Sequence, residues 1–241
     1  MYQTKSILLP VFNGEKFLKQ QIESIITQLT ILDELIIFVD GANDRSLSIC
    51  EAYSNSNDNI ILYSSSKNNG LRKAINYLLP RASKEIIVFV DQDDVWLDGR
   101  LKDIEKLFKV YDCIIVDANI CDENLVKTGE SYFNVVKPTK NFLKMLYSCR
   151  VLGCCMAFKK SALEGILKIP YGCWHDHFLI LWMLLLRKKL HYYKKPLILY
   201  RRHVNTLSLA GVYSNKFKRL PAIFFNRVIL IVCLIKCKVL K

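Results

Sequence analysis

The chain has 241 residues, is 51% hydrophobic and carries a net charge of +13. This length and composition suit one large domain with a substantial core. The nine cysteines form no C-x-x-C pair and no histidine lies at zinc-finger spacing, which argues against a structural zinc site. The first residues contain no long apolar segment, so we expect no secretory signal and a cytoplasmic protein with free thiols.

Strand and helix patterns alternate through the first 90 residues. Apolar runs predict strands, and apolar residues at helical spacing predict helices between them. The predicted order is strand 6–12, helix 15–28, strand 34–40, helix 44–53, strand 59–65, helix 68–82 and strand 85–90. The strands are continuous apolar runs, which predicts a Rossmann-like, mostly parallel sheet with helices on both faces.

The pattern continues without a linker into the second half of the chain. We expect a helix at 100–111, a strand at 113–121 and a strand that turns into a helix at 154–166. Residues 1–210 are therefore predicted to form one α/β domain with two halves, one up to about residue 98 and one from residue 99 to about residue 210. Residues 211–241 are predicted to form a basic, apolar, helical extension.

The positive charge is confined to the end of the chain. Residues 177–241 contain 14 Lys and Arg and no acidic residue, whereas residues 1–176 are close to neutral. Such asymmetry indicates an anionic partner, which can be nucleic acid, phosphate groups or an anionic membrane surface.

Two apolar segments accompany this charge. The segment 178–186 is predicted to be a core helix. The segment 222–241 has an uninterrupted apolar run of only 8 residues, Val228 to Ile235, whereas a spanning helix needs about 20. We expect it to lie on an anionic membrane surface, and the alternative is a core helix with a solvated basic edge.

Polar residues follow the predicted parallel strands. In such sheets, ligands bind beyond the carboxyl ends of the strands. The first strand ends at Pro10 and Phe12, the second at Asp40, and the fourth at the acidic cluster 91–94. We therefore expect an aromatic ring, a single acid and an acidic cluster to meet in one crevice.

The pair Asp91 and Asp93 is the strongest chemical signal. Carboxylates one residue apart at a strand end can face the same ligand, and hard oxygen donors suit Mn²⁺ or Mg²⁺ shared with substrate phosphates. Such an ion would offset the repulsion between the acids and stabilise a leaving diphosphate. No G-x-G-x-x-G, P-loop or G-x-S-x-G motif is present, which argues against a dinucleotide oxidoreductase, a P-loop enzyme and an α/β-hydrolase.

Taken together, these segments resemble the family 2 glycosyltransferases of the GT-A fold. The resemblance rests on "LLPVFNGEKFLKQQIESI", "IIFVDGANDRS", "NNGLRKAIN", "IIVFVDQDDVWLDGRL" and "WHDHF", and spans about residues 5–210. The "DQDDVW" form is similar to transferases that build bacterial O-antigens and capsules. The resemblance implies an inverting, metal-dependent transfer of a sugar from a UDP- or dTDP-linked donor to a glycan acceptor. A polyprenyl-diphosphate-linked glycan is one candidate acceptor.

The resemblance also assigns roles to individual residues. It implies that the donor nucleotide contacts Pro10, Phe12, Asp40, Asn68, Gly70 and Asp91. Phe12 would stack on the base, Asp40 would accept from the base ring N–H, and Asp91 would face the ribose. Ile75 stands where the family commonly has arginine, so a diphosphate contact is expected from Arg72 or Lys73.

The remaining assignments concern the metal and the acceptor. Asp93 and His203 are the implied metal ligands, and Asp94 is the implied support. Asp176, the last acid in the chain, matches the family's catalytic base, although a helix N-cap is an equally physical role for it. His175 would orient the base or the acceptor. Gly153 would leave room for a sugar.

Two other functions compete with this one. A nucleic-acid-binding protein could use the basic C-terminal quarter, but the acidic cluster would repel phosphates unless a metal intervened, so we expect no nucleic-acid partner. A sugar nucleotidyltransferase shares the sheet type, but needs a glycine-rich basic loop after the first strand, and "PVFNGEKF" is not one.

Overall fold

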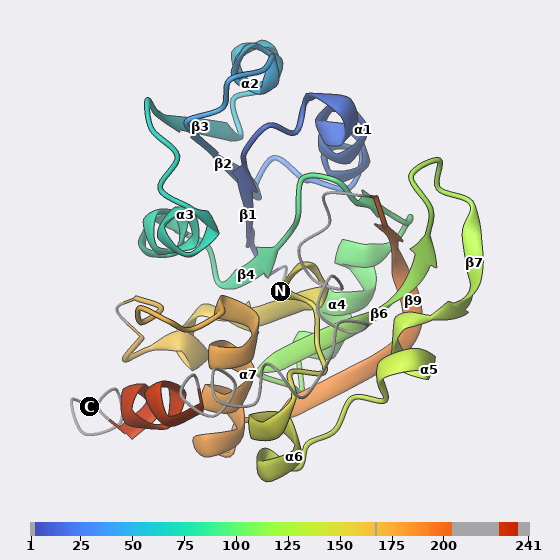
Figure 1. The fold of residues 1–241 in the computed structure, drawn as a ribbon. Coiled ribbons are helices and arrows are strands. Elements are labelled where there is room, and N and C mark those ends of the chain that lie inside the picture. Colours follow the sequence, from blue (N-terminus) through green and yellow to red (C-terminus); the bar gives the residue numbers. More distant parts are fainter. Residues whose placement is uncertain (1–2, 167, 204–226, 236–241) are drawn as a thin grey trace.

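The computed structural model describes residues 3–166, 168–203 and 227–235. Within these residues nine strands form one sheet in the order β3-β2-β1-β4-β8-β6-β9-β5, with β7 paired to β6. The α/β fold with helices on both faces of the sheet is therefore confirmed. In Figure 1, α3 and α7 lie on one side of the sheet and α1 and α4 on the other.

The first half of the chain is a parallel β/α unit. β1 pairs in parallel with both β2 and β4, and β2 with β3. The strands form because their apolar runs are buried on both faces. The elements are β1 (Lys5–Val11), α1 (Glu15–Ile26), β2 (Glu34–Asp40), α2 (Ser46–Ser56), β3 (Ile60–Ser65), α3 (Leu71–Leu78), η1 (Leu79–Arg81) and β4 (Ile86–Phe89).

The second half adds antiparallel pairings. β8 pairs antiparallel with β4 on one side and β6 on the other, so it joins the two halves of the sheet. β9 runs parallel to β6. The elements are β5 (Val95–Trp96), α4 (Arg100–Phe108), β6 (Cys113–Cys121), β7 (Lys127–Ser131), α5 (Tyr132–Val136), α6 (Phe142–Tyr147), η2 (Gly153–Cys155), β8 (Met156–Lys159), η3 (Lys160–Leu163), α7 (His175–Leu185) and β9 (Leu190–Arg201).

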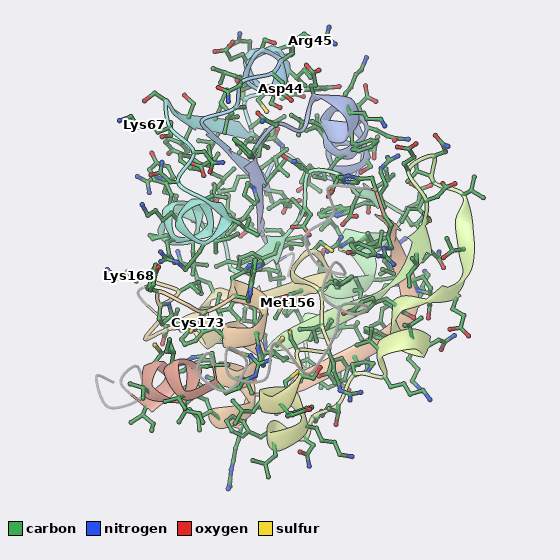
Figure 2. All side chains as sticks on the ribbon, viewed as in Figure 1. Asp44, Arg45, Lys67, Met156, Lys168 and Cys173 are labelled. Atoms are coloured by element: carbon green, nitrogen blue, oxygen red, sulfur yellow. The ribbon has the colours of Figure 1, made fainter. Side chains whose placement is uncertain are left out.

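Several predicted helices are shorter in the structure: α1 ends at Ile26, α3 begins at Leu71 and α4 ends at Phe108. Two further predictions need correction. The helix expected at 44–53 begins at Ser46, and Asp44 accepts a hydrogen bond from the Ser46 N–H at 2.9 Å without being the N-cap residue. The helix expected to end the segment 154–166 is only the short 3₁₀ turn η3. Figure 2 shows the resulting distribution of side chains, with Met156 of β8 in the interior and Arg45 and Lys67 at the periphery.

The C-terminal apolar segments differ in their surroundings. α7 is buried from Phe178 to Met183, as predicted for a core helix. Residues 227–235 are helical and lie beside α7, drawn in red in Figure 1. No helix among the described residues is long and apolar enough to span a membrane. The predicted domain boundary near residue 210 falls outside the described residues.

Candidate active site

The carboxyl ends of β1, β2 and β4 open into a cavity of about 1260 Å³. Most of the predicted site residues line it, from both halves of the chain, and Asp94, Arg72 and Lys73 do not. Those that line it are Pro10, Phe12, Asp40, Asn68, Gly70, Asp91, Asp93, Gly153, His175, Asp176 and His203. The cavity exceeds the volume that one drug-sized ligand needs, so it has room for two substrates.

One end of the cavity is organised by Gln92. Its Oε1 accepts from the Phe12 N–H at 2.8 Å, and its Nε2 donates to the Phe12 carbonyl at 2.9 Å. A Cβ atom on Gly14 would lie 2.6 Å from the same amide oxygen, so a glycine is needed for this approach. Gln92 therefore fixes the half-exposed ring of Phe12 relative to the acids on either side of Gln92.

Asp40 is buried and holds the loop that follows β3. Its carboxylate accepts from the backbone N–H of Asn69 at 2.9 Å and from that of Gly70 at 2.7 Å. Asn68 adds a second bond to Gly70 N–H at 2.8 Å. A Cβ atom on Gly41 would lie 2.3 Å from the Asn68 nitrogen, so β2 and this loop meet only because glycine has no side chain. The Asn69 side-chain amide also donates to Asp40 Oδ1, at 3.2 Å, so the carboxylate is already largely engaged within the protein.

Asp93 and His203 face one another across the cavity wall. His203 Nε2 lies 2.8 Å from Asp93 Oδ2, so the pair offers one oxygen donor and one nitrogen donor to a divalent metal ion. Arg201 fixes the same loop from behind: its Nε donates to the Asp93 carbonyl at 2.7 Å, and its backbone N–H donates to Asp94 at 3.1 Å. Its guanidinium also lies over the Phe17 ring, 4.3 Å from the centroid.

Asp94 is buried beneath this loop with Asp91 and Cys154 close by. One oxygen of each carboxyl group and the Cys154 sulfur lie within 4.8 Å of one another. Burial and the neighbouring acids raise the pKa of Asp91 to about 7 and raise the pKa of Asp94 well above its usual value. The contact with Cys155 and burial raise the pKa of the Cys154 thiol, so it stays protonated and is a poor metal ligand.

The opposite end of the cavity is formed by α7 and η2. Asp176 lies in the first turn of α7, so it is not the N-cap residue, which is Trp174. His175 lies directly above Gly153, since a Cβ atom there would come within 2.3 Å of the His175 Nε2. Burial lowers the pKa of His175, so its imidazole is neutral. The charge of Asp176 contributes, after burial and the charge of Asp93, to the raised pKa of Asp91.

The diphosphate contacts predicted from α3 are not present. Neither Arg72 nor Lys73 lines the cavity. Arg72 instead lies 5.2 Å from the ring centroid of Tyr171, and Asn76 exchanges two hydrogen bonds with the backbone of Ile169, at 2.6 and 2.9 Å. α3 thus holds the segment that leads into α7.

Two cavity residues were not singled out from the sequence. The role of Gln92 could not be predicted from the sequence, because it binds backbone atoms of a residue 80 positions away. Arg227 was treated only as part of a basic tail, yet its side chain lines the cavity. The signal available for Arg227 was its position immediately before an apolar helical run.

Comparison with known proteins identifies the family. The family model Glycosyl transferase family 2 matches residues 6–167. The chain belongs to glycosyltransferase family 2.

Relatives of this glycosyltransferase occur in bacteria. It is 29% identical to the glycosyltransferase GlyA of Streptococcus pneumoniae over 88% of the chain, and 28% identical to the dTDP-rhamnosyl transferase RfbG of Shigella flexneri over 88% of the chain and 78% of RfbG. It is also 28% identical to a GalNAc(5)-diNAcBac-PP-undecaprenol beta-1,3-glucosyltransferase of Campylobacter jejuni, over 88% of the chain and 69% of that protein. The chain spans only 32% of the length of GlyA.

Solved structures share the fold. S. aureus TarS 1–349 in complex with UDP-GlcNAc has a TM-score of 0.69 at 20% identity, over 93% of this chain and 66% of that one. The mannosyltransferase PcManGT of Pyrobaculum calidifontis, in complex with GDP-Man and Mn²⁺, has a TM-score of 0.59 at 17% identity, over 81% of this chain and 55% of that one. The glycosyltransferase therefore has the GT-A fold.

The contact between Gln92 and Phe12 can be tested in solution. Replacement of Gln92 by Leu removes the acceptor of the Phe12 N–H, and one such bond is worth about 1 kcal/mol. We expect hydrogen exchange at the Phe12 amide to become about five- to tenfold faster. Asn55→Leu, which changes an exposed amide on α2, is the matched control. Unchanged exchange in Gln92→Leu would contradict the proposed role.

The buried acids predict an unusual pH dependence of stability. Because the pKa of Asp91 and of Asp94 is higher in the folded protein than in the unfolded chain, their contribution is present at pH 4 and is lost as the pH rises towards 7. Asp94→Asn mimics the protonated form. In metal-free urea titrations at pH 7.5 we expect this variant to exceed the wild type in free energy of unfolding by about 1 kcal/mol or more. The exposed Asp98→Asn should show no gain.

Proposed function

We propose that this glycosyltransferase moves a sugar from a UDP- or dTDP-linked donor to a hydroxyl group of a bacterial surface glycan, with inversion and with Mn²⁺ or Mg²⁺. The observation that carries the proposal is the arrangement of one cavity. Phe12, Asp40, Asp93 and Asp176 all line it. We call the part formed by Phe12, Asp40 and Asp93 the donor end, and the part formed by Asp176, His175 and Gly153 the acceptor end. The nucleotide sugars named with TarS and with RfbG support the donor class.

The donor end has a group for each part of a nucleotide sugar. Phe12 offers a flat, half-exposed face to the base, and Asp40, which lines the cavity beside it, would accept from the base ring N–H. Asp91 would face the ribose, while Asp93 and His203 would hold the ion. The metal would neutralise negative charge that develops on the leaving diphosphate, and the Mn²⁺ complex of PcManGT supports this choice.

The acceptor end supplies the base. Asp176 projects from the first turn of α7, where no hydrogen bond from another side chain of the described residues to its carboxylate is present. An acceptor hydroxyl that attacks the anomeric carbon can pass its proton to this carboxylate. The attack comes from the side opposite the leaving diphosphate, and one such displacement inverts the anomeric centre. Neutral His175, seated on Gly153, would orient the acceptor.

We also propose that the protein works at the inner face of the cell membrane. Helix 227–235 buries Leu230 and Leu234 against the domain, but leaves an apolar stripe exposed. Its members are Val228, Ile231, Val232 and Ile235. The spacing i, i+3, i+4, i+7 places them on one face, and the excess of basic residues in 177–241 favours an anionic surface.

The two ends of the cavity can be separated by mutation. Asp93→Asn should remove the metal-dependent part of UDP binding, about tenfold or more in Kd, because it deletes a charged ligand. Asp176→Asn should bind UDP with Mn²⁺ normally but reduce sugar transfer at least 100-fold. Isothermal titration and a nucleotide-release assay over a panel of nucleotide sugars measure the two effects.

The control for both variants is Asp98→Asn, an exposed acid outside the cavity. Normal turnover by Asp176→Asn would exclude that residue as the base. Tight binding of duplex DNA without metal, unchanged in Asp93→Asn, would favour a nucleic-acid-binding protein instead.

The membrane stripe has its own test. Replacement of Val228, Ile231, Val232 and Ile235 by Ser should lower binding to phosphatidylglycerol vesicles about tenfold or more, because buried apolar area drives interfacial binding. Co-sedimentation measures it. Val110→Ser with Val126→Ser, two valines exposed elsewhere, is the control. Equal sedimentation of all three proteins would show that the stripe is not the anchor.

A further inference from the structure

Arg227 connects the C-terminal helix to the acceptor end of the cavity. It is the first residue of helix 227–235, and its half-buried side chain lines the cavity. Its Nη2 donates to the Tyr147 carbonyl at 3.2 Å, and its Nη1 lies 3.3 Å from Nδ1 of His177. The guanidinium is therefore fixed by α6 and α7, beside the residue that follows Asp176 in the chain.

The direction of the bond to His177 follows from the other ring nitrogen. His177 Nε2 lies 2.7 Å from the Met145 carbonyl oxygen, which can only accept, so Nε2 carries the proton. Nδ1 then has a lone pair and accepts from Arg227. The imidazole is neutral, because burial and the charge of Arg227 lower its pKa to about 4. A neutral partner leaves the positive charge of Arg227 uncompensated.

Arg227 has hydrogen-bonding capacity to spare. A guanidinium carries five N–H groups, and the contacts with Tyr147 and His177 involve Nε, Nη1 and Nη2 once each. One N–H on each terminal nitrogen therefore remains. Among the described residues no carboxylate lies within 4.0 Å of this side chain. These two N–H groups can donate to the oxygens of a phosphate.

Arg227 differs from the other basic side chain that lines the cavity, because it has no acidic partner among the described residues. Lys16 is the other described lining residue with a permanent positive charge, and it pairs with Glu123 at 2.9 Å. The donor end thus has metal ligands for phosphate, whereas the acceptor end has Arg227. Asp93 and His203 follow β4 and β9, whereas Arg227 is held by Tyr147 of α6 and His177 of α7.

The helix that begins with Arg227 carries the apolar stripe of Val228, Ile231, Val232 and Ile235 on its exposed side. On its inner side, Ile229 packs near Gly172, where an added Cβ atom would lie 3.5 Å from it, and Leu230 lines the cavity. A single short helix therefore presents a phosphate-binding group to the cavity and an apolar surface immediately outside it.

We propose that Arg227 binds a phosphate of the diphosphate that links the acceptor glycan to a lipid, with the lipid lying along the apolar stripe of the same helix. The inference rests on the proposed function and names the acceptor class for that site. The acceptor hydroxyl would face Asp176 while its diphosphate faces Arg227, with neutral His177 adjacent to both. The charge of Arg227 thereby attracts the acceptor without competing for the proton-accepting role of Asp176.

The test uses the full chain saturated with UDP and Mn²⁺, so that the donor end is occupied. Farnesyl diphosphate, titrated calorimetrically below its micellar concentration, is the probe, and farnesol is the probe without phosphate. We expect Arg227→Gln to weaken farnesyl diphosphate binding about 10- to 100-fold, the range for hydrogen bonds to charged groups. Farnesol binding should be unchanged.

Two further variants make the result specific. Arg227→Lys keeps the positive charge but loses the paired N–H groups of the guanidinium, so its loss of farnesyl diphosphate affinity should be intermediate. A loss as large as that of Arg227→Gln would indicate that any change at this position disrupts the helix. Arg81→Gln removes the same charge from an exposed position outside the cavity and should bind like the wild type.

The outcomes distinguish this proposal from the proposed function. Equal farnesyl diphosphate binding by Arg227→Gln and wild type, or no binding by the wild type while UDP binds with Mn²⁺, overturns the Arg227 assignment alone. Failure of UDP to bind with metal overturns the donor site, and the comparison of Arg227→Gln with the wild type, repeated without UDP, still decides the Arg227 assignment.

Discussion

The close packing of three carboxyl groups at the end of β4 is the constraint on which the site depends. Asp91, Asp93 and Asp94 would repel one another if all were charged, and burial adds to the cost. Each has a different environment. Asp94 is buried and its pKa is raised well above the usual value, Asp93 faces His203, and burial and the neighbouring acids raise the pKa of Asp91 to about 7. Arg201, the last residue of β9, holds this arrangement in place. Its backbone N–H donates to Asp94 and its Nε donates to the Asp93 carbonyl.

The same loop also fixes the rest of the donor end. Gln92 lies between two of the acids and binds both backbone groups of Phe12, so the backbone of Phe12 is tied to the acidic cluster. Asp40 holds the 68–70 loop in a comparable way. The site therefore consists of loops that bind one another through backbone groups, and glycines at 14 and 41 permit the close approach. Such mutual support is how a site on loops becomes pre-organised.

Sequence patterns predicted some parts of this structure and not others. β2 and β6 have the expected bounds, because their buried apolar runs end at polar residues. The pairing of β9 with β6 and β5 was not predicted, since it depends on contacts between segments far apart in the chain. The same limit applied to the contact of Arg227 with His177, 50 positions apart. Residues after parallel strands were predictable because sheet geometry brings them together.

The basic C-terminal quarter shows why a charge count could indicate an anionic partner without identifying it. Its described basic residues have different environments. Arg201 is buried and binds backbone carbonyls, and Lys195 pairs with Asp103 on the surface at 2.7 Å. Only a side chain that is held in place, lacks a carboxylate and faces a cavity can select a ligand by geometry. Among the basic residues that the structure describes in this quarter, Arg227 combines these three properties, so its position, more than the net charge, specifies where an anionic group of a substrate would bind.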